Sequence, residues 1–339
     1  MKKITFLCWI ICVSIFSILC TSCNSKKKQS EITSRIEYSV NIQSPEADMD
    51  WWNQNLEGTQ RDFISKLLME TAAKGELALE DLDYKTLSAK NLSEIYKLHD
   101  SVHFTFQDKI LDTLISGEIT QKNIKRLRFR EQWMLSDKSF EIEKRVTAIC
   151  PVAVFYDAEG IEIYSKPLYW IKINTEKKSS DMKTLTERIQ YDVPIQNPNN
   201  KKDWWVENIE SQLRNKFLNT LMEAAYSDKY PLYDNFKAKI TAAELKSTLN
   251  FSDTLQLTSP NPPYVEYDTV IVNTFDCSDI RRIRFMEEWK INPTTFEFNK
   301  RIIGICVVLN SYDSNNEFRG IRPLFWMYFD EKYPAALGK

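Results

Sequence analysis

The sequence predicts an α+β protein of two tandem homologous domains, each with a long amphipathic helix and a shorter helix packed on an antiparallel β-meander. The first observation behind this prediction is an internal repeat. FREQWMLSDKSFEIEKRVTAICPV, at residues 129–152, returns 156 positions later as FMEEWKINPTTFEFNKRIIGICVV. The second is RIEYSVNIQ, from Arg35, which returns 153 positions later as RIQYDVPIQ. Agreement in the same order over most of both halves indicates a tandem duplication of one domain.

Each copy is expected to begin with a half-buried strand. Ile36, Tyr38, Val40 and Ile42 alternate with polar residues, which is the period of a strand with one face in a core. Residues 189–195 repeat the same alternation. Both copies should therefore enter their sheet in the same way.

A long amphipathic helix is expected next in each copy. Apolar residues recur at helical spacing over residues 52–68 and again over residues 205–221. Asp50 and Asp203 precede these stretches and are expected to cap the helices. The Trp-Trp pairs that follow them could instead form a glycan-stacking platform, but packing in the core is the favoured interpretation.

The rest of each copy reads as a short helix and a sheet. The short helix is expected at residues 88–97, and its counterpart should begin at a Thr241 N-cap. Apolar alternation over residues 127–154, and a last strand at residues 161–173 after a turn, predict an antiparallel meander. One face of this meander should pack on the helices.

The repeat and the composition shifts divide the chain into five parts. They are a signal peptide at 1–22, a polar tether at 23–34, copy one at 35–173, a charged linker at 174–187 and copy two at 188–339.

The first residues resemble a secretory signal of the lipoprotein type. Lys2 and Lys3 precede an almost wholly apolar run at residues 4–19, and the small residues Thr21 and Ser22 precede Cys23. Cys23 is therefore the expected lipidation site, and its acyl chains would hold the protein on a membrane. A single transmembrane anchor is the alternative, although the apolar run is short for a bilayer.

Charge and composition argue against several function classes. Loss of Lys2 and Lys3 with the signal leaves 43 of the 45 basic side chains against 47 acidic ones, a formal charge of −4, which disfavours nucleic acid as a partner. With two His and seven Gly in the chain, His-based catalysis, metal sites and phosphate loops have few residues to build on. His99 and His103 have the spacing of a helical metal pair but no third ligand. We expect no enzyme activity, no cofactor and no metal.

The remaining cysteines and tryptophans are expected to be structural. Cys150 and Cys306 occupy the same place in the two copies, within apolar strands, and read as buried small hydrophobes. A disulfide between Cys277 and either of them is the alternative. The sheet tryptophans of both copies are expected in the core: Trp133, Trp170, Trp289 and Trp326.

Two glutamates fall on the apolar parity of their strands. Glu131 lies between Phe129 and Trp133, and Glu287 has the same setting in copy two. A buried carboxylate needs a partner. The lysines of matching parity on the next strand are Lys144 for copy one and Lys300 for copy two, so we expect the structural pairs Glu131–Lys144 and Glu287–Lys300. A general acid or base with a raised pKa is the functional alternative.

Several of these motifs resemble one known family. REQW at 130–133 and MEEW at 286–289, then RIIGIC at 301–306 and PLFWMYF at 323–329, are similar to the GldN/PorN family. In that family a K-E-D-W segment, an R-I-I-G-I-A-P segment and a P-L-F-W-I-Y-Y segment follow one another in this order. GELALEDLDYKTLSAKNL, from Gly75, also resembles a section of it.

The resemblance implies a periplasmic structural subunit of the gliding motility and type IX secretion apparatus, which assembles into a ring with a lipoprotein. Family members carry one such domain and a plain secretory signal, whereas this chain has two domains and its own lipid signal. It could replace the separate lipoprotein or serve another envelope assembly.

These expectations combine into one predicted function. It is a non-enzymatic, lipid-anchored structural subunit of a periplasmic envelope assembly, with membrane lipid, other proteins or further copies of itself as partners. No acidic run follows Cys23, which favours the periplasmic side of the outer membrane. The alternative is an outer-membrane lipoprotein that binds glycan or peptide ligands.

Overall fold

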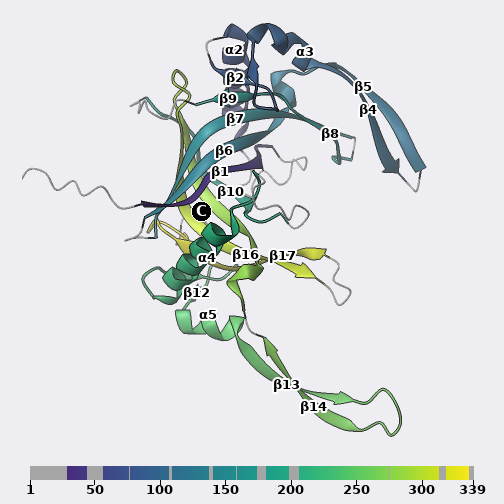
Figure 1. The fold of residues 1–339 in the computed structure, drawn as a ribbon, viewed down its shortest axis with the longest axis vertical. Coiled ribbons are helices and arrows are strands. Elements are labelled where there is room, and N and C mark those ends of the chain that lie inside the picture. Colours follow the sequence, from purple (N-terminus) through teal and green to yellow (C-terminus); the bar gives the residue numbers. More distant parts are fainter. Residues whose placement is uncertain are drawn as a thin grey trace, which may run out of the picture.

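The protein is mostly β, with one large antiparallel sheet and a few short helices (Figure 1). The computed structural model describes residues 29–335, except 44–55, 76, 107–108, 137–139, 158, 174–180, 198–205, 274 and 313–317. The expected fold class, α+β with long helices on a meander, is therefore wrong. The helices cover only 17 and 16 residues in α2 (Gly58–Lys74) and α4 (Ser211–Tyr226), while the strands of both copies join in a 13-stranded sheet.

The same order of elements occurs twice along the chain. The first copy contains β1 (Gln29–Asn41), α2, β2 (Leu79–Glu80), β3 (Thr86–Leu87), α3 (Leu92–Tyr96), β4 (Lys97–Phe106), β5 (Lys109–Glu118), β6 (Ile124–Ser136), β7 (Ile142–Tyr156), β8 (Glu162–Pro167) and β9 (Trp170–Lys172). The second contains β10 (Lys183–Pro194), α4, β11 (Leu232–Tyr233), β12 (Lys239–Ile240), α5 (Ala242–Leu249), β13 (Phe251–Thr258), β14 (Glu266–Asn273), β15 (Ile280–Ile291), β16 (Phe298–Tyr312) and β17 (Phe318–Tyr328). Short 3-10 turns at Ala89–Asn91, Gln121–Asn123 and Cys277–Asp279 complete the list.

The helices begin later than the apolar pattern suggested. Helix α4 starts at Ser211, and the Glu210 side chain caps it by accepting the amides of Gln212 and Leu213. Residues 206–208 form a turn and residues 209–210 are not helical, so the expected helix start near Trp205 is wrong for the described residues that follow it. Trp205, like the expected Asp caps and the Trp pair of copy one, lies outside the described residues. The Thr241 N-cap of α5 is confirmed, with Thr241 Oγ1 accepting from the Glu244 amide.

Antiparallel ladders build one ribbon of strands from each copy. In copy one β1 pairs with β6, β6 with β7, and β7 with β8 and β9. In copy two β10 pairs with β15, β15 with β16, and β16 with β17. A single bridge between Arg145 of β7 and Asn299 of β16 joins the two ribbons. Strand β1 begins within the expected tether and β10 within the expected linker.

Bulges recur at the same places in both copies. The β6–β7 ladder shifts between Arg130 and Glu131, and the β15–β16 ladder shifts between Met286 and Glu287. A bulge changes how the following side chains are aimed. Both glutamates follow such a shift, and both side chains lie inside.

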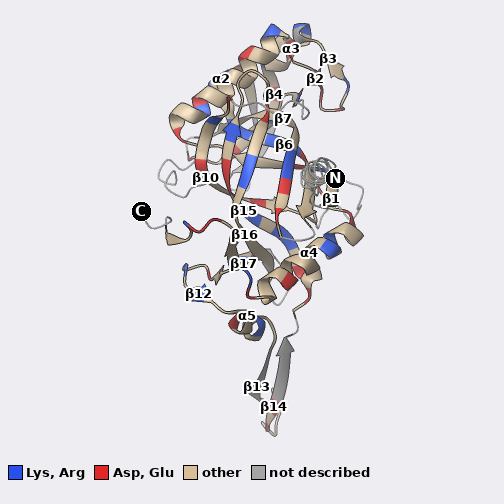
Figure 2. Ribbon diagram, turned by 90° about the vertical axis from the view of Figure 1, so that its left-hand side faces the viewer, with Lys and Arg blue, Asp and Glu red and all other residues tan. Residues whose placement is uncertain are grey.

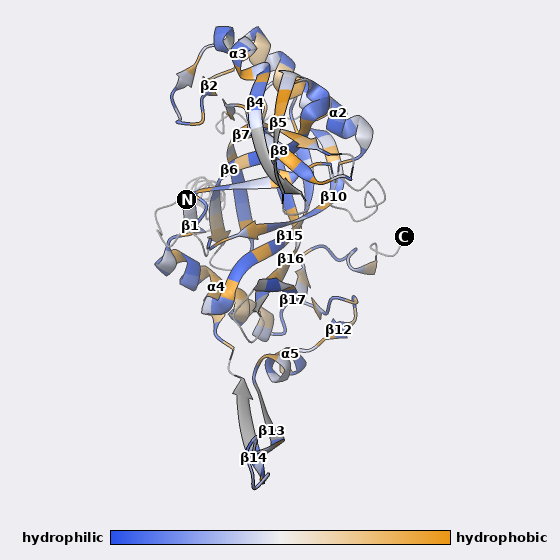
Figure 3. Ribbon diagram, turned by 90° about the vertical axis from the view of Figure 1, so that its right-hand side faces the viewer, coloured by the Kyte–Doolittle hydropathy of each residue, from blue (hydrophilic) through white to orange (hydrophobic). Residues whose placement is uncertain are grey.

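One hydrophobic core spans the two copies. Apolar segments run through the strands of the central sheet (Figure 3). The expectation that the four sheet tryptophans lie in the core is confirmed, with Trp133, Trp170, Trp289 and Trp326 all buried. Cys150 and Cys306 are free and buried, as expected, and Cys277 is free and half-buried.

Two β-hairpins extend from the body at its opposite ends, β4–β5 beside α3 and β13–β14 beyond α5 (Figure 1). Each is a separate two-stranded sheet. His99 and His103, which have the spacing of a helical metal pair, lie on the strand β4 and not on a helix. Within the described ranges, no helix is long and apolar enough to cross a membrane.

Candidate functional site

Four charged side chains meet inside the sheet where the two copies face each other. Glu131 on β6, Lys144 on β7, Glu287 on β15 and Lys300 on β16 form what we call the buried quartet. All four side chains are 0% exposed. The alternation of each strand directs them inward, as the parity of the sequence predicted.

The ion pairs of the quartet run between the copies. Lys144 Nζ lies 2.7 Å from Glu287 Oε1, and Lys300 Nζ lies 2.7 Å from Glu131 Oε1. The expected partners, Glu131 with Lys144 and Glu287 with Lys300, are thus exchanged.

The partners are exchanged because of the register of the strands and because copy two covers this face of copy one. Within copy one, Lys144 stands opposite Trp133, while Glu131 stands opposite Val146. Copy two supplies the surface that covers this face, and its Glu287 is within reach of the ammonium group. Strand parity fixes which face a side chain occupies, but it does not say which element packs on that face.

The second oxygen of each glutamate is bound by its own copy. Glu131 Oε2 accepts from the Tyr38 hydroxyl at 2.7 Å and from Trp133 Nε1 at 2.7 Å. In copy two, Glu287 Oε2 accepts from the Tyr191 hydroxyl and, at 2.9 Å, from Trp289 Nε1. Each carboxylate therefore has two neutral donors from its own copy and one cation from the other.

Aromatic rings enclose the two ammonium groups. Lys144 Nζ lies 3.1 Å from the ring centre of Phe285, and Lys300 Nζ lies 3.1 Å from that of Phe129. Each of these phenylalanines packs edge-on against a tryptophan of the other copy, Phe129 on Trp289 at 5.2 Å and Phe285 on Trp133 at 5.3 Å between ring centres. Attraction between a cation and a ring face offsets part of the cost of removing the charge from water.

The electrostatics of the quartet favour ionised pairs. Burial alone would raise the pKa of Glu131, but Lys300 and then Lys144 outweigh it and hold that pKa below the ordinary 4.5. Burial lowers the pKa of Lys300 to about 8, against the opposing effect of Glu131 and Glu287. Burial, followed by the nearby Glu131 charge, raises the pKa of Tyr38, so its hydroxyl remains a donor at neutral pH.

This geometry suits cohesion between the copies better than chemistry on a substrate. A general acid or base must reach a reacting group, whereas these side chains have no exposed surface. The pairing is also reciprocal, since each copy gives its lysine to the other's glutamate. Reciprocal contact is the mark of a two-fold interface between like subunits.

A second polar cluster lies on the outer face of copy one. Glu37 is almost fully buried and pairs with Arg35 at 2.6 Å and Arg130 at 3.0 Å. Arg130 also pairs with Glu80 at 3.0 Å, and Lys172 with Glu80 at 3.1 Å. Figure 2 shows basic and acidic segments side by side on the strands around β6. Arg128 pairs with Glu37 at 3.2 Å and with Glu207 of copy two at 3.7 Å, so the cluster also reaches the second copy.

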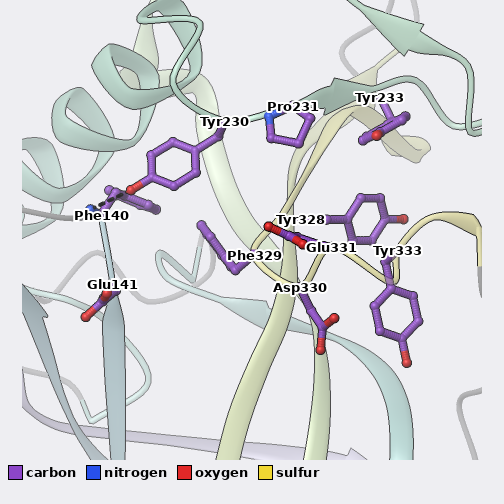
Figure 4. Close-up of a pocket in the computed structure, with 10 residues that line it drawn as sticks. All are labelled: Phe140, Glu141, Tyr230, Pro231, Tyr233, Tyr328, Phe329, Asp330, Glu331 and Tyr333. Atoms are coloured by element: carbon purple, nitrogen blue, oxygen red, sulfur yellow. Dashed lines mark hydrogen bonds between the residues drawn. The ribbon is translucent and has the colours of Figure 1, made fainter.

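A pocket of about 410 Å³ lies where Phe140 and Glu141 of copy one meet residues of copy two (Figure 4). We call it the aromatic pocket. Six rings line it, one from copy one and five from copy two: Phe140, Tyr230, Tyr233, Tyr328, Phe329 and Tyr333.

Contacts between rings and backbone hold the pocket together. Tyr328 stacks on Tyr333 with ring centres 6.1 Å apart, and Tyr233 lies 5.6 Å from Tyr328. The Tyr230 hydroxyl accepts the Phe140 amide at 3.0 Å, which ties copy one to the pocket. Three carboxylates also line it, those of Glu141, Asp330 and Glu331.

The structure does not describe the expected lipidation site. Cys23 lies outside the described residues. No group of three His, Cys, Asp or Glu side chains that could hold a metal occurs among the residues the structure describes.

The sequence reasoning missed Tyr38 and Tyr191 as members of the network, and it missed the aromatic pocket. Both tyrosines have a polar tip on the apolar parity of a strand, which is a signal for a buried hydrogen bond. A difference between the two copies was a signal for the pocket. Tyr233 and Tyr328 of copy two occupy the positions of Glu80 and Lys172 in copy one, so two aromatic side chains replace two charged ones.

Fold and site together define a tandem-duplicated β-sheet protein whose copies are joined by reciprocal buried ion pairs. The family model described as gliding motility associated protein GldN matches the chain twice, at residues 48–203 and 178–336. The chain therefore belongs to the GldN family, with the family's domain duplicated, as the motifs predicted. No curated protein matches the chain.

Proposed function

We propose that the chain is a non-enzymatic, lipid-anchored structural subunit of a periplasmic envelope assembly in gliding motility or type IX secretion. The observation that carries this proposal is the double match to the gliding motility family, which together spans residues 48–336. Membership of that family makes a motility or secretion component the best-supported class.

The buried quartet supports a scaffold role. A subunit that transmits or bears load within an assembly needs domains that keep a fixed relation to one another. Two cross-copy ion pairs at 2.7 Å, inside one continuous core, give the two family domains such a relation. Relative motion of linked domains is expected unless their interface is large and apolar.

Native purification tests the assembly role. The chain carries a C-terminal tag, is expressed at its natural level and is extracted from membranes in mild detergent. Co-purification of a large complex with envelope proteins is the expected result. A monodisperse single chain at natural expression level would contradict the proposal.

The lipid anchor belongs to the same proposal and has its own test. It rests on the lipoprotein-type signal ending at Cys23. Cys23→Ala should leave the precursor uncleaved or release the product into the soluble fraction. Cys20→Ala is the matched control, because it changes a cysteine within the signal and should leave membrane attachment intact. A Cys23→Ala product that has the same size as the parent and stays attached would point to a transmembrane anchor instead.

A further inference from the structure

The two copies provide an internal comparison at the aromatic pocket. In copy one, the Arg130 guanidinium lies over the Trp170 ring at 4.4 Å and over the Tyr84 ring at 4.7 Å. Glu80 and Glu37 neutralise its charge. Copy one therefore fills its aromatic surface with its own arginine.

Copy two lacks that arginine. The ladders place Tyr233 opposite Trp326 as they place Glu80 opposite Trp170, so the two positions are structurally equivalent. At the repeat offset of 156, Met286 replaces Arg130. Rings replace the ion pairs, and none of the described residues that line the aromatic pocket is Lys or Arg.

Copy two also makes room for these rings. Gly304 stands opposite Tyr328 in the β16–β17 ladder. A Cβ at this glycine would lie only 2.6 Å from Tyr328 Cδ1, so the ring rests directly on the backbone. The equivalent residue of copy one is Ala148, opposite Lys172. The glycine and the tyrosine are thus matched to each other.

The charged side chains that line the pocket are acidic, while the Arg188 and Arg301 charges lie close enough to oppose the raised pKa of Tyr333. Glu141 and Glu331 are exposed at its edge. Asp330 accepts the Lys332 amide at 3.0 Å and pairs with Arg301 at 2.9 Å, and these contacts keep its pKa below 3.8. Burial raises the pKa values of Tyr328 and Tyr333, so both rings stay neutral.

We propose that the aromatic pocket binds an arginine side chain on a segment of a partner protein. Rings and carboxylates around one cavity complement a flat cation, and arginine stacks on aromatic faces while it hydrogen-bonds to carboxylates. Within copy one, Arg130 makes contacts of this kind with Trp170 and Glu80, at a place next to the pocket's equivalent, where copy two packs Met286 on Trp326. The inference rests on the proposed assembly role for the nature of the partner, but not for the binding itself.

Calorimetric titration of the full chain in detergent tests the binding. The probe is Gly-Gly-Arg-Gly-Gly with blocked termini, and the control probe carries citrulline, which has nearly the same shape without the charge. Saturable binding of the arginine peptide, weakened by added salt, and absent for the citrulline peptide is expected. A variant of the chain that lacks one stacking ring and one carboxylate of the pocket should bind the arginine peptide about tenfold more weakly.

The variants separate the pocket from general surface charge. Tyr333→Ala and Glu331→Gln remove a ring and a carboxylate at the edge of the pocket. Tyr264→Ala and Glu266→Gln make the same changes on the distant β13–β14 hairpin and should leave binding unchanged. Equal binding of both peptides, equal loss in both variant sets, or saturable binding of chitotriose without binding of the arginine peptide would each overturn the proposal.

The peptide titration and the native purification test the two proposals separately. If the arginine peptide binds but no complex co-purifies from membranes, the pocket stands and the assembly role fails. If a complex co-purifies while the peptide fails to bind, the assembly role stands and this inference is wrong.

Discussion

At the scale of single residues, the buried quartet shows how a charged group is tolerated in a core. Glu131 is met by a cation, a hydroxyl and an indole N–H, so the cost of taking it out of water is offset on both of its oxygens. The tyrosine and tryptophan come from its own copy and the lysine from the other. Removal of any one of these side chains leaves a buried polar or charged group without its hydrogen-bond or ion-pair partner.

Glu287→Ala should lower the free energy of unfolding by about 3–5 kcal/mol, because Lys144 is then buried without its anion. The double variant Glu287→Met with Lys144→Met should recover much of this loss, since it removes both charges of one pair. Glu287→Met with Lys300→Met is the matched control, and it should recover less, because it leaves Glu131 and Lys144 each without the ion-pair partner that it contacts at 2.7 Å. Urea unfolding measures all three, and equal recovery in both double variants would refute the exchanged pairing.

Acid should weaken the quartet. The pKa of Glu131 is below 4.5 in the folded chain, because the lysine charges outweigh the effect of burial. A carboxyl with a lowered folded-state pKa contributes stability that is fully present above pH 4.5 and is lost as the pH falls through the folded-state pKa, since the unfolded chain takes up the proton first. Unfolding free energies of the parent and of Glu131→Met with Lys300→Met, measured at neutral pH and below pH 4.5, should therefore converge on acidification. Parallel pH profiles would contradict this expectation.

At the scale of elements, the sequence predicted strands better than it predicted what covers them. The alternation in residues 127–154 located β6 and β7, because one face of each is buried and imposes a period of two. The hairpins β4–β5 and β13–β14 were missed, and each forms a two-stranded sheet separate from the large one. The helices begin after the apolar pattern does, and the fold class was wrong because strand content in these hairpins and ladders was underestimated.

The pairing of β16 with β17 depends on Gly304. Gly304→Ala should destabilise the chain by about 1–3 kcal/mol, because the added methyl group meets the Tyr328 ring at less than contact distance. Ala148→Gly makes the reverse change at the equivalent place in copy one and should cost about 0.5–1 kcal/mol through backbone entropy, with a further cost from the lost methyl group because Ala148 is fully buried. Thermal unfolding compares the two, and the near-ultraviolet dichroism of the tyrosines should change only in Gly304→Ala. A neutral Gly304→Ala would show that Tyr328 moves aside freely.

At the scale of the whole molecule, duplication lets an interface between like domains lie within one chain. Tyr38 stacks on Tyr191 with ring centres 5.9 Å apart, and these two residues are equivalent in the repeat. Contact between equivalent residues places them beside the axis of a two-fold relation. The repeat alone revealed two copies, but it could not reveal their mutual packing, because the inward parity of Glu131 fits a partner within the copy as well as one across it.

Because the copies pack in this way, they should stay together after the chain between them is cut. A protease site inserted within residues 174–180, between β9 and β10, is cleaved in the folded full chain. The joint core and both ion pairs remain after cleavage, so the fragments should co-elute in size-exclusion chromatography with the mass of the parent. Covalent linkage acts as an effective concentration on the order of millimolar, and its loss should expose any weakness of the interface. The cut Glu287→Ala variant should then separate on dilution while the cut parent does not. If the cut parent itself separates at micromolar concentration, the linker and not the quartet holds the copies together.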